Sequence, residues 1–327
     1  MKGGITAIAA YVPERRVTND ELAETVDTSD EWIVSHTGIR ERRLATAEQA
    51  SSDLGIEAVR KALEKAHLAP EEVDLLIGAT STPDYAPFPA TACVIQDRLG
   101  CDNAGAFDLQ AGCTGFVYGL EVARGLMLSG SAKRILVVGT EKLSSITNWE
   151  DRSTCVLFGD GAGAAVLDAD ATEGHEILGS HLRSQGSGDT ALIRELGGSR
   201  TPFDPAKHTV AETMLYMDGR KVYLFAVDAI VKTIKQLCAD QGIAIDDLAW
   251  IVPHQANLRI IEAAAKRLGV PVDRFYTNLD RFANTSAASI PIAIEEMEER
   301  GLLKKGDTIL TVGFGAGLTY GGNVIRW

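Results

Sequence analysis

Basic charge is scarce in this 327-residue sequence, and so are the cysteine patterns of metal and redox sites. Acidic residues outnumber basic ones by 45 to 32, which gives a net charge of −13 at pH 7. A global positive field for nucleic acid is therefore excluded, although a local basic patch is not. The five cysteines include no Cys-x-x-Cys pair, which argues against a zinc or thioredoxin-type site. Their odd number argues against a disulfide framework.

Long hydrophobic runs are also missing. No stretch approaches the roughly 18 apolar residues that a membrane helix needs. The apolar start, MKGGITAIAAYVPERR, leads into charges without a cleavage signature, so a strand accounts for it better than a signal peptide. We therefore expect a cytoplasmic protein with reduced thiols and with neither a membrane nor a nucleic-acid partner.

Short apolar runs alternate with amphipathic ones along the chain. This alternation predicts an α/β fold in which helices cover both faces of a mostly parallel sheet. Buried strands are expected at residues 74–80, 134–140, 163–169, 248–254, 307–315 and 323–327. Helices are expected at residues 51–68, 257–270 and 286–303. Ser51 and Ser52 are expected to cap the first of these helices.

A weak internal repeat divides the sequence. AFDLQAGCTG is similar to FYTNLDRFANTSA, and RILVVGTEKLS is similar to TILTVGFGAGL, at an offset near 170–175 residues. The repeat predicts two similar halves, residues 1–172 and 173–327, joined by the linker DADATEGHE at 168–176. A coincidence of generic α/β patterns is the alternative, and the repeated order of three elements counts against it. The polar segment 184–210 is expected to be a surface excursion.

Cys113 lies between a strand pattern and a helical pattern, in DLQAGCTGFVYG. The flanking Gly112 and Gly115 tolerate a strained backbone and let a substrate come close. A helix start carries partial positive charge and free N–H groups, which lower the pKa of a thiol. We therefore expect a nucleophile, with a packed core cysteine as the alternative. Core packing is the expectation for three other cysteines, Cys93, Cys155 and Cys238.

Two polar residues occupy similar positions. His254 ends the apolar run of AWIVPHQAN, and α/β proteins place their chemistry at the carboxyl ends of strands. Asn284, in RFANTSAAS, falls near the place of Cys113 in the repeat. The plain alternatives are a structural histidine and a helix N-cap. The run GFGAGLTYGG lacks the context of a phosphate loop, and its N–H groups are available for an oxyanion.

Several motifs together resemble the β-ketoacyl-acyl-carrier-protein synthase III family of the thiolase-like superfamily. They are DEWIVSHTGIRERR (30–43), GCTGF (112–116), DRSTCVLFGDGAGA (151–164), PHQAN (253–257), NTSAAS (284–289) and GFGAGLTYG (313–321). The resemblance covers essentially the whole chain. It implies a thiolase-like five-layer αβαβα fold with two similar halves, and a homodimer. It also implies condensation of a short acyl-CoA, such as acetyl-CoA, with malonyl-acyl carrier protein, which initiates fatty-acid synthesis without metal or redox cofactor.

The resemblance further implies roles for individual residues. Catalysis falls to Cys113, His254 and Asn284, and the backbone N–H groups of Cys113 and Ala316 hold the oxyanion. Coenzyme A contacts fall on Thr28, Trp32, His36, Thr37, Arg152, Gly219, Asn257 and Arg259. The acyl pocket falls on Leu143, Phe158 and Phe88, the last of which matches the residue that closes the partner's pocket in this family.

His36 departs from the family pattern, which usually has Arg at this position. An imidazole that is mostly neutral does not clamp phosphate as a guanidinium does, so contact with coenzyme A is expected to be weaker or differently arranged. An acidic carrier protein also requires a basic patch on this acidic chain. We expect the carrier-protein patch at Arg259, Lys266 and Arg267, with an ordinary solvated helix face as the alternative.

Other activities stay open. The nearest is a ketosynthase of secondary metabolism, or an acyl-CoA condensing enzyme, with the same three residues. A thiolase is disfavoured because GFGAGLTYG contains no second cysteine, and a non-catalytic protein of this fold because all three residues are present. The preferred primer depends on pocket volume, which the sequence does not fix.

Overall fold

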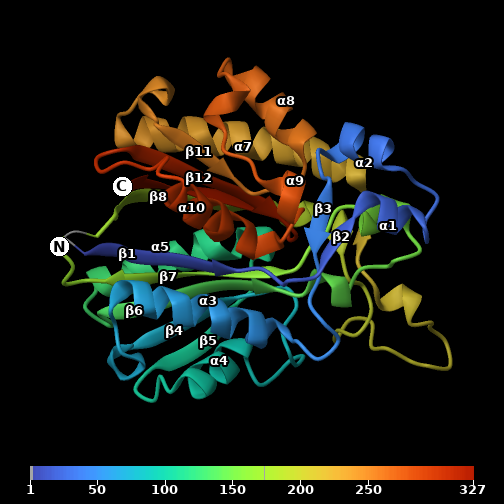
Figure 1. The fold of residues 1–327 in the computed structure, drawn as a ribbon, viewed down its shortest axis with the longest axis horizontal. Helices are drawn as coiled ribbons and strands as arrows, with labels where there is room; N and C mark the ends of the chain where they lie inside the picture. The colour runs from blue at the N-terminus through green and yellow to red at the C-terminus, as the bar shows by residue number, and fades with distance from the viewer. Residues whose placement is uncertain (1–2, 173) are drawn as a thin grey trace.

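The computed structural model describes residues 3–172 and 174–327, whose helices and sheets stack in five layers (Figure 1). Helices form the two outer layers and the central one, and a sheet lies between each pair. From bottom to top in Figure 1, these helices are α3 (Ser51–Ala66) and α4 (Thr91–Leu99), then α5 (Gly115–Leu128) and α10 (Ser289–Glu299), then α7 (Gly219–Gln241) and α8 (Leu258–Leu268). The predicted αβαβα architecture is confirmed.

The first sheet has five strands in the order β1-β7-β6-β4-β5. β4 pairs in parallel with β5 and β6, whereas β7 pairs antiparallel with β6 and β1. The strands are β1 (Gly4–Tyr11), β4 (Leu75–Ala79), β5 (Gly105–Leu109), β6 (Arg134–Glu141) and β7 (Gly161–Asp168). Helices cover both faces of β6, which explains why its sequence is a continuous apolar run.

The second sheet repeats this arrangement with the order β11-β12-β13-β8. β11 pairs in parallel with β12, and β13 pairs antiparallel with β12 and β8, as β4, β6, β7 and β1 do in the first sheet. The strands are β8 (Glu176–Ser184), β11 (Trp250–Pro253), β12 (Thr308–Gly315) and β13 (Thr319–Arg326). The prediction of two similar halves is therefore confirmed. Their division at residue 172 stays a prediction, and Glu173 of the expected linker lies outside the described residues.

Short elements connect the layers. The remaining strands and α-helices are β2 (Arg16–Thr18), β3 (Glu41–Arg43), β9 (Leu192–Ile193), β10 (Tyr216–Met217), α1 (Asn19–Ala23), α2 (Asp30–Thr37), α6 (Arg152–Cys155) and α9 (Leu279–Phe282). The 3-10 turns are η1 (Pro70–Glu72), η2 (Gly112–Thr114), η3 (Leu143–Ser145), η4 (Gly186–Gly188), η5 (Ala211–Thr213), η6 (Ile245–Asp247), η7 (Val272–Arg274) and η8 (Ser286–Ala288). The segment 184–210 is mostly irregular, as expected.

Two local predictions were wrong. Ser51 and Ser52 do not cap α3, because Ala50 is the N-cap and its N–H donates to the Asp53 carboxylate at 2.7 Å. Both serines are instead buried in the first helical turn. Cys93 is exposed on α4, whereas the other two cysteines assigned to the core are buried.

The central helices position the site because both begin at the same end of the molecule. Phe116 and Leu120 of α5 and Ile290 and Ile294 of α10 belong to one buried apolar cluster between the sheets. Each helix is preceded by a 3-10 turn, η2 or η8, and the two turns lie against each other. The repeat therefore brings two equivalent strand-to-helix turns together.

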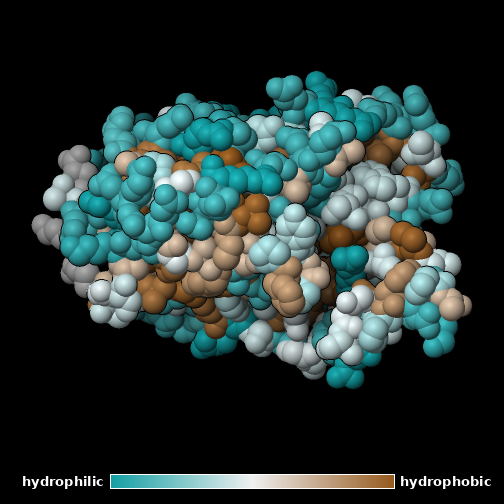
Figure 2. All heavy atoms as spheres, turned by 90° about the horizontal axis from the view of Figure 1, so that it is seen from below, coloured by the Kyte–Doolittle hydropathy of each residue, from teal (hydrophilic) through white to brown (hydrophobic). Residues whose placement is uncertain are grey.

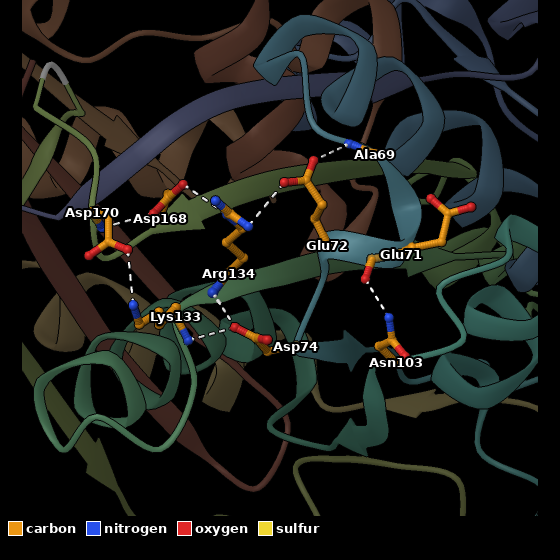
Figure 3. A network of polar contacts seen from close by, with 9 residues as sticks. All are labelled: Ala69, Glu71, Glu72, Asp74, Asn103, Lys133, Arg134, Asp168 and Asp170. Carbon is orange, nitrogen blue, oxygen red and sulfur yellow. Dashed lines mark hydrogen bonds and ion pairs between the residues drawn. The ribbon is translucent and has the colours of Figure 1, made fainter.

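Charged residues tie the opposite end of the first sheet together (Figure 3). Arg134, which begins β6, contacts Glu72 at 3.1 Å and Asp168 at 3.3 Å. The Asp74 carboxylate accepts hydrogen bonds from the backbone N–H groups of Lys133 and Arg134, both at 2.8 Å. Exposed ion pairs stabilise weakly, so the Asp74 bonds are expected to add more to the stability of this end of β6 than the ion pairs of Arg134 do.

Candidate active site

Cys113 lies in η2, between β5 and α5, at the strand-to-helix turn that the sequence predicts. Gly112 has φ +53°, and a side chain there would come within 2.9 Å of the Ala316 nitrogen. A Cβ atom on Gly315 would lie 2.5 Å from the Cys113 nitrogen. The end of β12 therefore packs directly on the cysteine turn, and glycines permit this contact between the two halves.

Cys113, His254 and Asn284 line one cavity of about 270 Å³. They come from three places in the fold: η2, the residue after β11, and the residues before η8. Apolar side chains line much of the remaining wall, including those of Leu143, Ile146, Val156, Phe158, Leu215 and Phe314. The structure thus brings together the three residues that the sequence singles out.

Loss of solvation raises the pKa of the Cys113 thiol to about 12 although the residue is only partly buried, and the nearby Ser286 hydroxyl opposes this rise. We expected the start of α5 to lower the pKa and favour the thiolate. That expectation was wrong in direction, because loss of solvation is the larger effect. The thiol is protonated at neutral pH, and it needs a proton acceptor when it attacks.

His254 is buried, with 1% of its surface exposed. Its Nδ1 lies 2.7 Å from the Ser289 hydroxyl oxygen, and the edge of its ring meets Phe314 at a centroid distance of 5.2 Å. Burial lowers the pKa of His254 to about 3. The imidazole is therefore neutral, and it can offer a hydrogen bond without carrying charge.

Asn284 is held on both sides by backbone contacts. Its N–H donates to the Leu157 carbonyl at 2.9 Å, and its side-chain oxygen accepts from the Ser286 N–H at 2.8 Å. The side chain therefore restrains the turn before η8, but Thr285 and not Asn284 is the N-cap of that element. Since the oxygen is occupied, the amide N–H groups remain as donors beside the cavity.

Five of the eight expected coenzyme A contacts line the same cavity: Trp32, His36, Thr37, Gly219 and Asn257. Thr28, Arg152 and Arg259 are not part of its wall. The Arg152 guanidinium lies over the Trp32 ring at 5.0 Å and donates to the Asp27 carbonyl at 2.8 Å.

His36 stacks on the Trp32 ring, with centroids 4.3 Å apart and planes 19° apart. Its Nδ1 lies 2.7 Å from the Trp32 carbonyl oxygen, which can only accept, so Nδ1 carries a proton. One ring nitrogen is therefore used inside α2, and only Nε2 remains for a ligand. An arginine would offer several donors at this position.

The expected acyl-pocket residues separate into two groups. Leu143 and Phe158 line the cavity, whereas Phe88 does not and is 78% exposed in the loop before α4. Sequence reasoning missed most of the apolar wall, including Leu192, Leu215 and Met217 in and after the polar segment 184–210 and Leu318 in the turn between β12 and β13. Their only signal is a short apolar run, ALI at 191–193 or MLYM at 214–217, or the single leucine of the glycine-rich run GFGAGLTYGG.

The three residues expected to form a carrier-protein patch lie on α8, whose N-cap is the cavity residue Asn257. Arg259, Lys266 and Arg267 are all exposed. Arg267 contacts Asp228 of α7 at 3.0 Å, which reduces its contribution to a positive surface.

Within residues 3–172 and 174–327, no three His, Cys, Asp or Glu side chains are grouped to hold a metal ion. None of the helices in this part of the chain is long and apolar enough to cross a membrane.

Comparisons with known proteins identify the family. Residues 107–186 match the family model for 3-oxoacyl-[acyl-carrier-protein] synthase III, and residues 238–327 match the model for its C-terminal part. The β-ketoacyl-[acyl-carrier-protein] synthase III of Caldanaerobacter subterraneus subsp. tengcongensis is 50% identical over 327 residues, which cover 99% of this chain and 97% of that protein. The chain belongs to the β-ketoacyl-[acyl-carrier-protein] synthase III family.

Solved structures agree with this assignment. The synthase III of Thermus thermophilus is 45% identical, with a TM-score of 0.91 and 99% of both chains covered. The priming β-ketosynthase of the R1128 polyketide pathway is also similar, at 35% identity and a TM-score of 0.89, with 99% of this chain and 96% of that chain covered. The similar structures thus include one from a polyketide pathway.

Proposed function

We propose that this synthase III family member condenses a short acyl-CoA, acetyl-CoA in the simplest case, with malonyl-acyl carrier protein. The products are 3-ketoacyl-acyl carrier protein, coenzyme A and CO₂. The observation that carries the proposal is one largely apolar cavity that brings a cysteine at a helix start together with a neutral histidine and an asparagine amide.

The first half-reaction loads the acyl group on Cys113. Its sulfur attacks the thioester carbonyl, the carbon–sulfur bond to coenzyme A breaks, and an acyl-enzyme remains. The backbone N–H groups of Cys113 and Ala316 would hold the oxyanion, since Gly112 packs closely against Ala316. The acyl chain would lie among Leu143, Phe158 and their apolar neighbours.

The second half-reaction forms the carbon–carbon bond. His254 and Asn284 would donate to the malonyl thioester oxygen, so that the electron pair released with CO₂ is stabilised as an enolate. This role requires the ring proton of His254 on Nε2, with the Ser289 hydroxyl donating to Nδ1 while its oxygen accepts from the Gln255 N–H at 3.3 Å. The enolate carbon attacks the acyl-cysteine carbonyl, and Cys113 leaves as thiolate.

Binding of coenzyme A is the proposed role of the cavity residues Trp32, His36, Thr37, Gly219 and Asn257. Thr28, Arg152 and Arg259 would contact it outside the cavity wall. Carrier-protein docking on Arg259 and Lys266 is proposed from their exposure beside the cavity, with a smaller part for Arg267. The absence of a cofactor and a cytoplasmic location stay predictions.

A second copy of the chain is the proposed partner of the face below β5 and α4. β5 is an edge strand, whose unpaired backbone groups invite a further strand. Phe107 on β5 is 38% exposed, and Tyr85 and Phe88 of the neighbouring loop are 55% and 78% exposed. Figure 2 shows this lower face, on which hydrophobic areas interrupt the polar surface. Sedimentation of the wild type and of Phe107→Asp tests the dimer.

A priming ketosynthase of secondary metabolism is the second candidate, because the R1128 relative is 35% identical. The two activities differ in the acyl group and the carrier protein. Condensation rates measured with a panel of acyl-CoAs and carrier proteins would distinguish the two activities.

Intact-mass measurement after incubation with acetyl-CoA and longer acyl-CoAs tests the proposal. We expect one acyl adduct on the wild type and none on Cys113→Ser. No adduct with any acyl-CoA, from protein that is folded by thermal melting, would contradict it.

A further inference from the structure

Glu141, the last residue of β6, is fully buried with one oxygen crowded by donors and the other without a partner. Its Oε2 accepts from the Ser81 N–H at 3.0 Å, the Thr82 hydroxyl at 2.8 Å and the Thr80 hydroxyl at 3.3 Å. Its Oε1 is buried and has no hydrogen bond within the described part of the chain. Because donors surround Oε2, a proton arriving at this carboxyl group would go to Oε1.

Ser286, the first residue of η8, is 2% exposed, and its hydroxyl oxygen is likewise buried without a hydrogen bond among the described residues. Its φ is +49°, where side chains are disfavoured. The equivalent residue of the first half is Gly112, with φ +53°. Ser286 thus keeps a side chain in a conformation that favours glycine, and strained residues of this kind cluster at functional sites.

The two unpartnered oxygens lie near the nucleophile. η8 packs on both η2 and β6, and the cavity wall includes Cys113 and Ser286. The Ser286 hydroxyl lies close enough to Cys113 and to Glu141 to lower the pKa of each against the rise that burial causes, and the Ala287 backbone also lowers that of Glu141. The hydroxyl forms no hydrogen bond with either group in this structure, so it is free to turn from one to the other. Ser286 is therefore the hydroxyl that can connect the thiol with the carboxylate.

We propose that Ser286 passes the thiol proton of Cys113 to Glu141 Oε1 as the acyl group is loaded. The inference rests on the proposed function in taking Cys113 as the nucleophile. As sulfur attacks the thioester, its proton goes to Ser286 Oγ and the Ser286 proton goes to Glu141. Coenzyme A leaves as thiolate and takes a proton from solvent. When condensation expels the Cys113 thiolate, the proton returns from Glu141 by the same route.

The relay accounts for deprotonation of Cys113, which His254 is poorly suited to bring about. The lowered pKa of His254 and the raised pKa of Cys113 both oppose transfer between them, whereas burial raises the pKa of Glu141 and makes it a stronger base. Transfer of the thiol proton from Cys113 to Glu141 moves one negative charge from the carboxylate to sulfur and adds no new buried charge.

Other ionisable groups near Glu141 are engaged elsewhere. The Lys142 ammonium donates to the Thr46 and Gln49 carbonyls. The Asp160 carboxylate accepts from Ser144 and from the Ala45 N–H.

Alkylation of Cys113 by iodoacetamide, measured as a function of pH, tests the relay without an acyl substrate. The variants are Glu141→Gln, which keeps the shape but takes no proton, and Ser286→Gly, which fits the positive φ. Asp160→Asn is the matched control, because it changes another buried carboxyl of the same half. Thermal melting of each variant reports its folding.

We expect both variants to alkylate at least tenfold more slowly at pH 7, with the rate rising only at higher pH. The double variant should be no slower than the slower single variant, because both changes break one relay. Decarboxylation of malonyl-acyl carrier protein should fall less than alkylation. The Asp160→Asn control should keep the wild-type pH profile. Unchanged profiles in both folded variants would overturn the relay, as would single effects that multiply in the double variant.

The alkylation assay uses no acyl-CoA, so its result does not depend on whether acyl-CoA is the substrate. Loss of acyl adducts with normal alkylation would count against the proposed substrate only.

Discussion

Replacement of Gly315 by alanine tests the close contact between the two halves. The added methyl group would lie 2.5 Å from the Cys113 nitrogen and 3.0 Å from its Cβ, both well inside ordinary contact. These atoms belong to the backbone turn η2 and cannot rotate away, so the turn or the end of β12 must shift by roughly 1 Å. Overpacking of this kind costs about 1–3 kcal/mol of stability. A displacement of about 1 Å at a nucleophile lowers the rate roughly 100-fold.

Stopped-time intact-mass measurement of acyl-enzyme formation gives the rate, and thermal melting gives the stability. Gly125→Ala is the matched control, because no atom lies within 4 Å of its added methyl group. The control should acylate normally and gain about 0.4–1 kcal/mol, since alanine restricts the unfolded chain. Normal acylation by folded Gly315→Ala would refute the contact between β12 and the cysteine turn.

Three further outcomes are expected. Burial lowers the pKa of folded His254 to about 3, so below about pH 6.5 only the unfolded chain binds a proton there, and the protein becomes less stable as the pH falls. Between about pH 6.5 and 5 the free energy of unfolding of the wild type should fall by about 2 kcal/mol more than that of His254→Gln in denaturant titrations. His36→Arg should tighten coenzyme A about tenfold in calorimetry, because a guanidinium offers several donors where the stacked imidazole offers only Nε2; unchanged affinity would show that no phosphate lies there. Asp74→Ala should cost about 1–3 kcal/mol by removing two backbone hydrogen bonds at the start of β6, while leaving the acylation rate of folded protein unchanged.

The repeating part of the fold was predictable because it depends on local pattern. β6 and β12 are continuous apolar runs, as buried strands require, and Gly269 ends α8 with φ +73°. The turn carrying Cys113 was predictable for the same reason, since glycines flank it between a strand and a helix. The N-cap of α3 was not predictable from local sequence, because the Ser51 hydroxyl donates instead to the carbonyl of Thr82, which is distant in the sequence, at 2.5 Å.

The pKa values of Cys113 and Glu141 depend on contacts between residues that are distant in the sequence. Glu141 and Ser286 are far apart in the chain, and only the packing of η8 on β6 brings them together. The helix start next to Cys113 is visible in the sequence, but the desolvation that outweighs it depends on the whole cavity wall. Leu215 and Met217 join that wall from a segment with no regular pattern. Such features need the folded structure.

Product formation from acetyl-CoA and malonyl-acyl carrier protein tests the central claim most directly. We predict that the wild type releases 3-ketoacyl-acyl carrier protein and CO₂ in equal amounts, and that Cys113→Ser releases no condensed product. Condensed product from Cys113→Ser at the wild-type rate would contradict the claim that this residue carries the acyl group.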